Sequence, residues 1–542
     1  MCLLVPPVLA FIVHLPALSA SLFWDDGALI VSHPRIADPA FIKEIFSRDY
    51  GLELQLRAPI GYYRPLLLVV DYGLFQLFGP SAGAYHVAVL LTFCFSCFLL
   101  TAVAMRALGE QRRGVALAIG CIAAVHPVRT EFAVFFMSMP DIMIEIFILL
   151  MIANCLGFLG PWPTTLRALI AGVLALAAGL TKETSFLMIG AMGAALLVWG
   201  LYSSARRDPL LQALGWTLGL VAAFGFRFAG GVAMPFALRP DASVLVPLGN
   251  PSLPTLSVGS SRAVAGLAGS IGHLMVPSKT VFMSVIPDTP VFAALGIGVA
   301  GFGVAAAFAF WLIRRQRLFE ALVGAWLAAG FASLMLLCAR DYPFADRYIP
   351  SGAAILALVM VTDYFWRRWR GDPGGGRWIP AVALVVYLGA LATFAWESTV
   401  RCRGIRAFFA AMADDNPSYY FPRVVLANIM LLQDDNSELA AKYMNEAIAL
   451  APDDPKVRSL GKSLAARYIA EAEYQKGLEA LDWSEQVLLK DAEIWSMRAT
   501  CQTGLLDYAG ALGSAQRARE LAPNHPDYVR QMEEIKQAAA GE

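Results

Sequence analysis

Charged residues are scarce in this 542-residue chain. They make up 15% of the sequence, whereas hydrophobic residues make up 58% and the mean hydropathy is +0.59. Soluble globular proteins carry about 25% charged and about 45–50% apolar residues. The composition therefore excludes an ordinary soluble enzyme, and nothing in it predicts a nucleic-acid partner.

Lysine is rare, and acceptor sites for N-linked glycans are absent. The chain holds 9 Lys against 33 Arg, and Ala and Gly are abundant, as in high-GC bacteria. No Asn-x-Ser/Thr with x other than Pro occurs, since both Asn250 and Asn416 are followed by Pro. These two features favour a bacterial inner membrane over an endoplasmic reticulum.

The eight cysteines predict no metal or redox site. Cys94 and Cys97 form a CxxC pattern, but it lies in an apolar run without a second pair or a His. Five cysteines lie in such runs, where a small buried hydrophobic residue is the default. Whether Cys402 and Cys501 pair is left open.

Charge divides the chain into two parts. Residues 403–542 hold 15 basic and 21 acidic residues, and the other 402 residues hold 27 basic and 21 acidic ones. We therefore expect a polytopic membrane domain over 1–402 and an acidic soluble domain over 403–542. Eleven apolar stretches approach the roughly 20 residues that cross a bilayer, some short enough for half-spans: 3–22, 85–106, 114–126, 141–159, 166–181, 184–202, 210–232, 291–313, 318–339, 348–366 and 378–397.

Arginine clusters predict the orientation of these spans. If all of them face the cytoplasm, the spans alternate without exception, as the positive-inside rule requires. The remaining connections and the C-terminal domain then face the extracytoplasmic (periplasmic) side. The clusters are Arg106, Arg112 and Arg113; Arg206 and Arg207; Arg314, Arg315 and Arg317; and Arg367, Arg368, Arg370 and Arg377.

Several apolar stretches have other interpretations. Cleavage of the first run after Ser19-Ala20-Ser21 is an alternative, but no Lys or Arg precedes that run, so we expect a retained helix. We expect interfacial helices over 63–78, which holds Asp71 and Gln76, and around 41–46. The stretch 262–286 predicts a re-entrant or lateral helix.

The C-terminal domain contains an internal repeat. Phe421 and Ala492 each start a unit with small residues and a closing proline at the positions of the tetratricopeptide repeat, which is about 34 residues long. A degenerate unit fits over 455–489. About three such repeats predict a short α-solenoid that could bind an extended peptide, or could serve only as a structural cap.

Ionisable residues gather on the predicted outer face. Asp25 and Asp26 follow the first span, and in an extended chain one would face a reacting group while the other supports it. Solvated loop residues are the simpler alternative. Ionisable groups among apolar residues are candidates for function, cations can clamp phosphate oxygens, and a carboxylate can take a hydroxyl proton. The further candidates are Arg64, His86, His126, Arg129, Glu131, Asp141, Lys182, Glu183, Arg347 and Tyr348.

These motifs, in their order, resemble the GT-C fold of polyprenyl-phosphate-sugar glycosyltransferases, and more closely the transmembrane-and-tetratricopeptide O-mannosyltransferase family. Over nearly the whole chain, the matching stretches are Phe23-Trp24-Asp25-Asp26, Tyr63-Arg64-Pro65-Leu66, Gly79-Pro80 with Tyr85-His86, His126-Pro127-Val128-Arg129-Thr130-Glu131, Lys182-Glu183, Ala345-Asp346-Arg347-Tyr348-Ile349-Pro350-Ser351 and the repeats. The chain departs from the family's Gly-Arg-Ala with Ser138-Met139-Pro140 before Asp141, and from its Glu-Arg with Asp346-Arg347.

The resemblance implies an all-α fold and a transferase that inverts the sugar's anomeric configuration. It would move a sugar, mannose in this family, from a polyprenyl-phosphate carrier to protein Ser/Thr hydroxyls. Asp25 would be the base and Asp26 its partner, while His126, Glu131, Lys182 and Arg347 would line the donor-phosphate and acceptor pocket. No cofactor is implied, and a divalent metal is left open. The alternatives are a lipid or glycan acceptor, and a non-catalytic membrane-anchored repeat scaffold for envelope assembly.

Overall fold

A computed structural model gives the fold. It describes residues 2–23, 25–33, 35–50, 62–202, 207–232, 267, 274, 317–339, 351–370, 378–434, 436–452, 454–485 and 491–540. The chain divides into two compact units, Met1–Ile405 and Arg406–Glu542.

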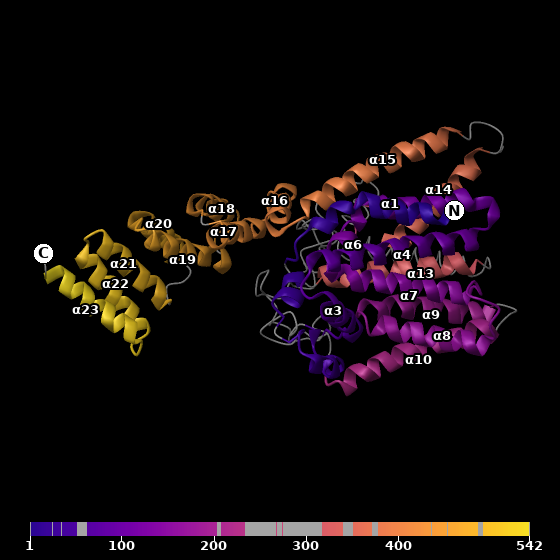
Figure 1. Cartoon of the computed structure of the whole chain (residues 1–542), viewed down its shortest axis with the longest axis horizontal. Coiled ribbons are helices and arrows are strands. Elements are labelled where there is room, and N and C mark those ends of the chain that lie inside the picture. The colour runs from indigo at the N-terminus through magenta and orange to yellow at the C-terminus, as the bar shows by residue number, and fades with distance from the viewer. Residues whose placement is uncertain are drawn as a thin grey trace. The chain divides into compact units, whose positions relative to one another are not determined.

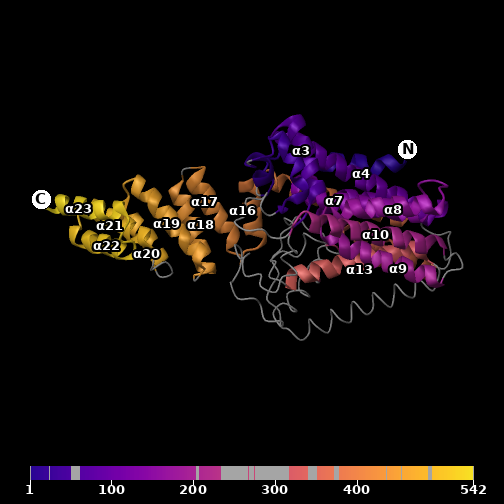
Figure 2. The ribbon, with the colours of Figure 1, turned by 90° about the horizontal axis from the view of Figure 1, so that it is seen from below.

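The first unit is built of helices, and no strand occurs in the described residues (Figure 1). The all-α prediction is therefore confirmed for this part of the chain. Helices α4, α7, α8, α9, α10 and α13 pack side by side, with α13 against α9 (Figure 2). The α-helices of this unit are α1 (Val5–Val13), α3 (Pro65–Phe78), α4 (Ala82–Leu108), α5 (Arg113–Val125), α6 (Glu131–Val134), α7 (Met139–Cys155), α8 (Thr164–Gly179), α9 (Thr184–Tyr202), α10 (Arg207–Ala229), α13 (Leu318–Ala339), α14 (Ser351–Arg370) and α15 (Trp378–Arg401).

Five helical segments in the described residues are long and apolar enough to cross a membrane: Ala82–Leu108, Phe136–Cys155, Thr184–Tyr202, Asp208–Ala229 and Val382–Arg401. A sixth candidate consists of Glu110–Val125 and Pro127–Val134, joined at a bend of 61°. This protein is therefore a multi-pass membrane protein.

The count of eleven spans stays a prediction. The predicted stretches 291–313 and 262–286 lie outside the described residues, apart from Leu267 and Leu274. The first predicted span is shorter than expected, since α1 ends at Val13 and a 3-10 turn, η2 (Leu15–Ser19), follows. Pro16 explains the break, because proline lacks the N–H that would continue an α-helix.

Small residues bring α8 and α10 into close contact. A Cβ atom at Gly215 or Gly219 of α10 would collide with the carbonyl oxygens of Ala168 and Gly172 on α8. Helices in membranes associate through such small-residue faces, because lipid tails leave little hydrophobic driving force between helices. The turn between α8 and α9, which carries Lys182 and Glu183, is thus held on a tightly packed helix pair.

Short elements cover one end of the helical bundle. The expected interfacial helix over 63–78 corresponds to α3, which has 14 residues and is shorter than a span. The helix expected around 41–46 is instead two 3-10 turns, η4 (Pro39–Lys43) and η5 (Ile45–Ser47). Phe41 and Ile45 are buried, whereas Ile42 and Phe46 are exposed.

The second unit is a succession of helix pairs. The pairs α17–α18, α19–α20 and α21–α22 begin at Phe421, Pro455 and Ala492, and α23 follows. These starts agree with the predicted repeat positions, but their assignment as tetratricopeptide repeats stays a prediction. The helices are α16 (Ile405–Asp415), α17 (Phe421–Leu432), α18 (Ser437–Leu450), α19 (Pro455–Ala470), α20 (Tyr474–Glu485), α21 (Ala492–Gly504), α22 (Tyr508–Leu521) and α23 (Pro526–Ala540).

Candidate active site

The two acids after the first helix lie in a helical turn rather than in extended chain. Asp25 and Asp26 precede the π-helical turn η3 (Gly27–Val31), and Asp26 has φ −62° and ψ −38°. The sequence-based expectation of an extended chain is therefore wrong. Carboxylates are favoured at the start of a helical segment, where backbone N–H groups carry partial positive charge.

Asp26 fastens this turn to the start of α7. It is buried, its Oδ1 accepts a hydrogen bond from the Met137 N–H at 2.8 Å, and its Oδ2 accepts one from the Phe136 N–H at 3.0 Å. Both donors belong to η8 (Phe136–Ser138). Hydrogen bonds from backbone N–H groups stabilise a carboxylate, so the geometry gives Asp26 a supporting contact with η8. Asp25 is less buried than Asp26.

Tyr50, which the sequence analysis did not single out, lies among the acids. Its side chain is fully buried, and its hydroxyl donates to the Met137 sulfur at 2.8 Å. Burial raises the pKa of this hydroxyl, the charge of Arg64 lowers it, and the charges of Asp25, Asp71 and Asp26 raise it further. Three carboxyl groups and one guanidinium are therefore grouped around Tyr50.

Arg64 and Glu183 join the start of α3 to the α8–α9 turn. Arg64 Nε donates to Glu183 Oε2 at 3.2 Å, and the Tyr63 N–H donates to Glu183 Oε1 at 2.6 Å. A second cation, Arg227 at the end of α10, lies 4.0 Å from Glu183 Oε1. The Arg64 guanidinium also lies over the Tyr50 ring, 4.8 Å from its centre.

Lys182 is paired with Asp141, on a different helix. Lys182 Nζ lies 2.6 and 2.7 Å from the two Asp141 oxygens, and the Lys182 side chain is 6% exposed. The sequence analysis named both Lys182 and Asp141 among the candidates. Because Asp141 lies in the first turn of α7, the pair ties α7 to the α8–α9 turn.

The bend between α5 and α6 carries three of the predicted residues. His126 Nδ1 accepts from the Val128 N–H at 3.2 Å, and His126 Nε2 lies 3.2 Å from the Leu274 carbonyl oxygen. Arg129 is fully buried, and its Nη2 donates to Glu145 Oε1 at 2.7 Å. Glu131 is also buried. Arg129 therefore serves an ion pair inside the bundle, and Glu145 is a partner that the sequence analysis missed.

The remaining predicted residues are less connected. His86 is buried in α4 beside the backbone of Ser21 and Val134. Arg347 and Tyr348 lie outside the described residues. Asp71, Glu145 and Arg227 had one usable sequence feature in common: each is an ionisable residue inside an apolar helix. Tyr50 had no such feature.

No metal or disulfide is evident in the described ranges. They hold no group of three or more His, Cys, Asp or Glu side chains arranged for a metal ion. Cys402 and Cys501 are both buried.

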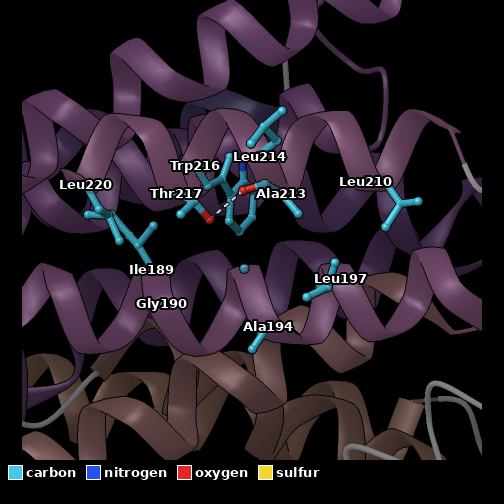
Figure 3. A pocket seen from close by; sticks show the side chains of 11 residues that line it. Ile189, Gly190, Ala194, Leu197, Leu210, Ala213, Leu214, Trp216, Thr217 and Leu220 are labelled. Carbon is cyan, nitrogen blue, oxygen red and sulfur yellow. Dashed lines mark hydrogen bonds between the residues drawn. The ribbon is translucent and has the colours of Figure 1, made fainter. Parts of the chain in front are cut away.

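A separate apolar groove lies between α9 and α10 and encloses about 420 Å³ (Figure 3). Its one hydroxyl, on Thr217, donates to the Ala213 carbonyl oxygen at 2.9 Å. The groove has no titratable side chain and therefore no acid–base chemistry of its own. It is lined by Ile189, Gly190, Gly193, Ala194, Leu197, Leu210, Ala213, Leu214, Trp216, Thr217 and Leu220.

Comparison with known proteins assigns no family. No protein-family model and no curated protein matches the chain. Among solved structures, the chain is similar to the archaeal oligosaccharyltransferase AglB from Archaeoglobus fulgidus in complex with an inhibitory peptide and a dolichol-phosphate. The TM-score is 0.38 and the identity 13%, over 83% of this chain and 59% of AglB. The chain thus spans less than two thirds of that protein, and the candidate site has to be interpreted from its own residues.

Proposed function

We propose that this protein is a membrane glycosyltransferase. It moves a sugar, mannose by the family resemblance, from a polyprenyl-phosphate carrier to Ser/Thr hydroxyls of proteins on the extracytoplasmic face of a bacterial inner membrane. The helix pairs of the second unit would present the protein acceptor.

One observation supports this proposal above the others. Asp26 contacts η8, Tyr50 contacts Met137 of η8, Arg64 stacks on Tyr50, and Glu183 binds Arg64. Segments more than one hundred residues apart in the sequence are therefore connected through polar side chains, all at helix ends. Acids and cations brought together at the end of a membrane bundle suit an anionic lipid head group and a proton transfer.

The reaction assigns a role to each charge. The acceptor hydroxyl oxygen attacks the anomeric carbon of the sugar, and the bond from that carbon to the phosphate oxygen breaks. Asp25 takes the hydroxyl proton, and the polyprenyl phosphate leaves with the bonding electrons. The negative charge that grows on the phosphate is stabilised by nearby cations, for which Arg64 and Arg227 are the candidates that the described residues supply.

The cations of the candidate site already have carboxylate partners, and this restricts where the donor phosphate can bind. In this structure Lys182 binds Asp141 through both carboxylate oxygens. A donor phosphate near Lys182 would therefore have to share that cation with Asp141, and one near Arg64 would have to share it with Glu183.

The test measures sugar transfer from a purified polyprenyl-phosphate sugar to a peptide in reconstituted membranes. Asp25→Asn keeps the shape of the side chain but removes the base, which should lower the rate by about 10²–10⁴-fold. Asp38→Asn is the matched control, since Asp38 lies in the same loop with a side chain 48% exposed. Near wild-type rates in both Asp25→Asn and Asp26→Asn, at normal expression, would exclude the assignment. Transfer to lipid but not to peptide would point to the alternative acceptor.

A further inference from the structure

Asp71 is a buried carboxyl group to which no described cation donates a hydrogen bond. It lies in α3, its residue is 1% exposed, and the Tyr85 hydroxyl of α4 donates to its Oδ1 at 3.1 Å. Its Oδ2 has no hydrogen-bond partner in the described part of the chain. An ionised carboxylate in this position would lose its hydration and gain one neutral donor in return, which is unfavourable.

The group is connected to Asp26, the partner of the candidate base, through packed side chains. The Tyr85 ring meets the Phe136 ring edge to face at 5.0 Å, and the Phe136 N–H is one of the two donors that hold Asp26. A shift of Asp71 or Tyr85 would thus reach the acid pair through one aromatic contact.

Most charged groups around Asp71 form contacts with residues other than Asp71. The acidic turn contributes Asp26, whose charge acts on Asp71 directly. Of the groups that act on Tyr50, Arg64 at the start of α3 is bonded to Glu183. On the side of η5, Glu44 is held by Arg35 and Arg48, and α4 contributes the neutral Tyr85.

Burial is the main cause that raises the pKa of the Asp71 carboxyl, to about 8. The hydrogen bond from Tyr85 lowers this pKa, and the charge of Asp26 raises it. At neutral pH the proton therefore stays on Asp71.

We infer that Asp71 is a positioning residue for the transfer reaction, a neutral acid behind Asp26 that adds no further negative charge to the Asp25–Asp26 pair. This inference rests on the proposed function. It assigns a role to a residue that acts through Asp26 and Tyr50 and does not touch the substrate.

The neutral state matters for the leaving group. Ionised Asp71 would place a third negative charge beside Asp26 and Tyr50. That charge would disfavour the anionic phosphate that forms during transfer. The transfer rate of the wild type should therefore fall as the pH rises through about 8.

The test compares pH–rate profiles of the wild type, Asp71→Asn and Asp71→Leu in the full-length protein. Asn is neutral and can still accept the Tyr85 hydrogen bond, so it should retain at least about tenfold more activity than Leu at pH 7. It should also lack the fall in rate near pH 8. A rate for Asp71→Asn as low as that of Asp71→Leu, or the same alkaline fall in wild type and Asp71→Asn, would overturn the inference.

A readout that does not need activity separates this inference from the proposed function. Infrared spectra of the wild type minus Asp71→Asn should show the C=O stretch of a protonated carboxyl at pH 7, and that band should disappear above about pH 8–9. If the band is present but no transfer is found, the proposed function is wrong and the neutral acid stands. If transfer is found and the band is absent at pH 7, the positioning role is wrong.

Discussion

Replacement of Asp71 by Asn should change how the stability of the membrane unit depends on pH. In the folded protein the pKa of the Asp71 carboxyl is about 8, whereas the ordinary pKa of an aspartate carboxyl is 3.8. The folded state thus binds one proton more than the unfolded state between these values. The stability that this group contributes is complete below about pH 4 and is lost as the pH rises through about 8. Asn carries no such proton.

The magnitude follows from the linkage between proton binding and folding. Well between the two pKa values, each pH unit costs the wild type about 1.4 kcal/mol of unfolding free energy relative to Asp71→Asn. Between pH 6 and pH 8 the accumulated loss is about 2 kcal/mol, because the slope decreases as the folded-state carboxyl becomes half ionised near pH 8. Above about pH 9 the difference between the two proteins should become constant.

The assay is reversible unfolding in mixed micelles at several pH values from 6 to 9.5, with unfolding free energies compared between variants at each pH. Tyr85→Phe serves as a directional control. The Tyr85 hydroxyl lowers the pKa of Asp71, so its removal should move the loss of stability to higher pH. Parallel curves for wild type and Asp71→Asn over the whole range would refute a neutral Asp71.

Two further predictions concern the ion pairs. A double-mutant cycle on Lys182→Met and Asp141→Asn should give a coupling of about 1.5–3 kcal/mol in unfolding free energy. The cycle on Lys182→Met and Glu183→Gln should give nearly no coupling. A larger coupling in the second cycle than in the first would show that the Lys182–Asp141 contact is misassigned. Glu145→Ala should cost about 3–5 kcal/mol, because it leaves the guanidinium of Arg129 buried without its carboxylate. The double variant Glu145→Leu/Arg129→Met, measured in the same way, should be more stable than Glu145→Ala, and a less stable double variant would contradict this.

The parts of the fold that follow from hydrophobic pattern alone could be predicted from the sequence. The apolar runs around α4, α9 and α10 correspond to helices long enough to cross a membrane, and the break at His126 agrees with a predicted short span. The compact units divide between Ile405 and Arg406, and the assignment of 1–402 and 403–542 as a membrane transferase domain and a repeat domain stays a prediction. Composition and periodicity indicate which residues are buried, and burial of apolar residues determines where these helices form.

The hydrogen-bond partners of the charged side chains could not be predicted from the hydrophobic pattern. Lys182 and Glu183 are adjacent in sequence, yet Lys182 binds Asp141 and Glu183 binds Arg64. These contacts depend on how α7, α8 and α3 pack, and no local pattern encodes that packing. The helical conformation of Asp25 and Asp26 was missed for a similar reason, because hydrogen bonds from η8 help to hold the turn.

These contacts have a common physical cause, the low dielectric constant inside a membrane protein. A charge there needs a compensating group, and Arg129, Lys182 and Arg64 each have a carboxylate within hydrogen-bonding distance. Asp26 accepts hydrogen bonds from two backbone N–H groups. Asp71 has only a tyrosine hydroxyl as its hydrogen-bond donor among the described residues, and it meets the same constraint by keeping its proton. The protonation state of Asp71 therefore sets the total charge beside the candidate base. An additional ion pair would leave that total charge unchanged.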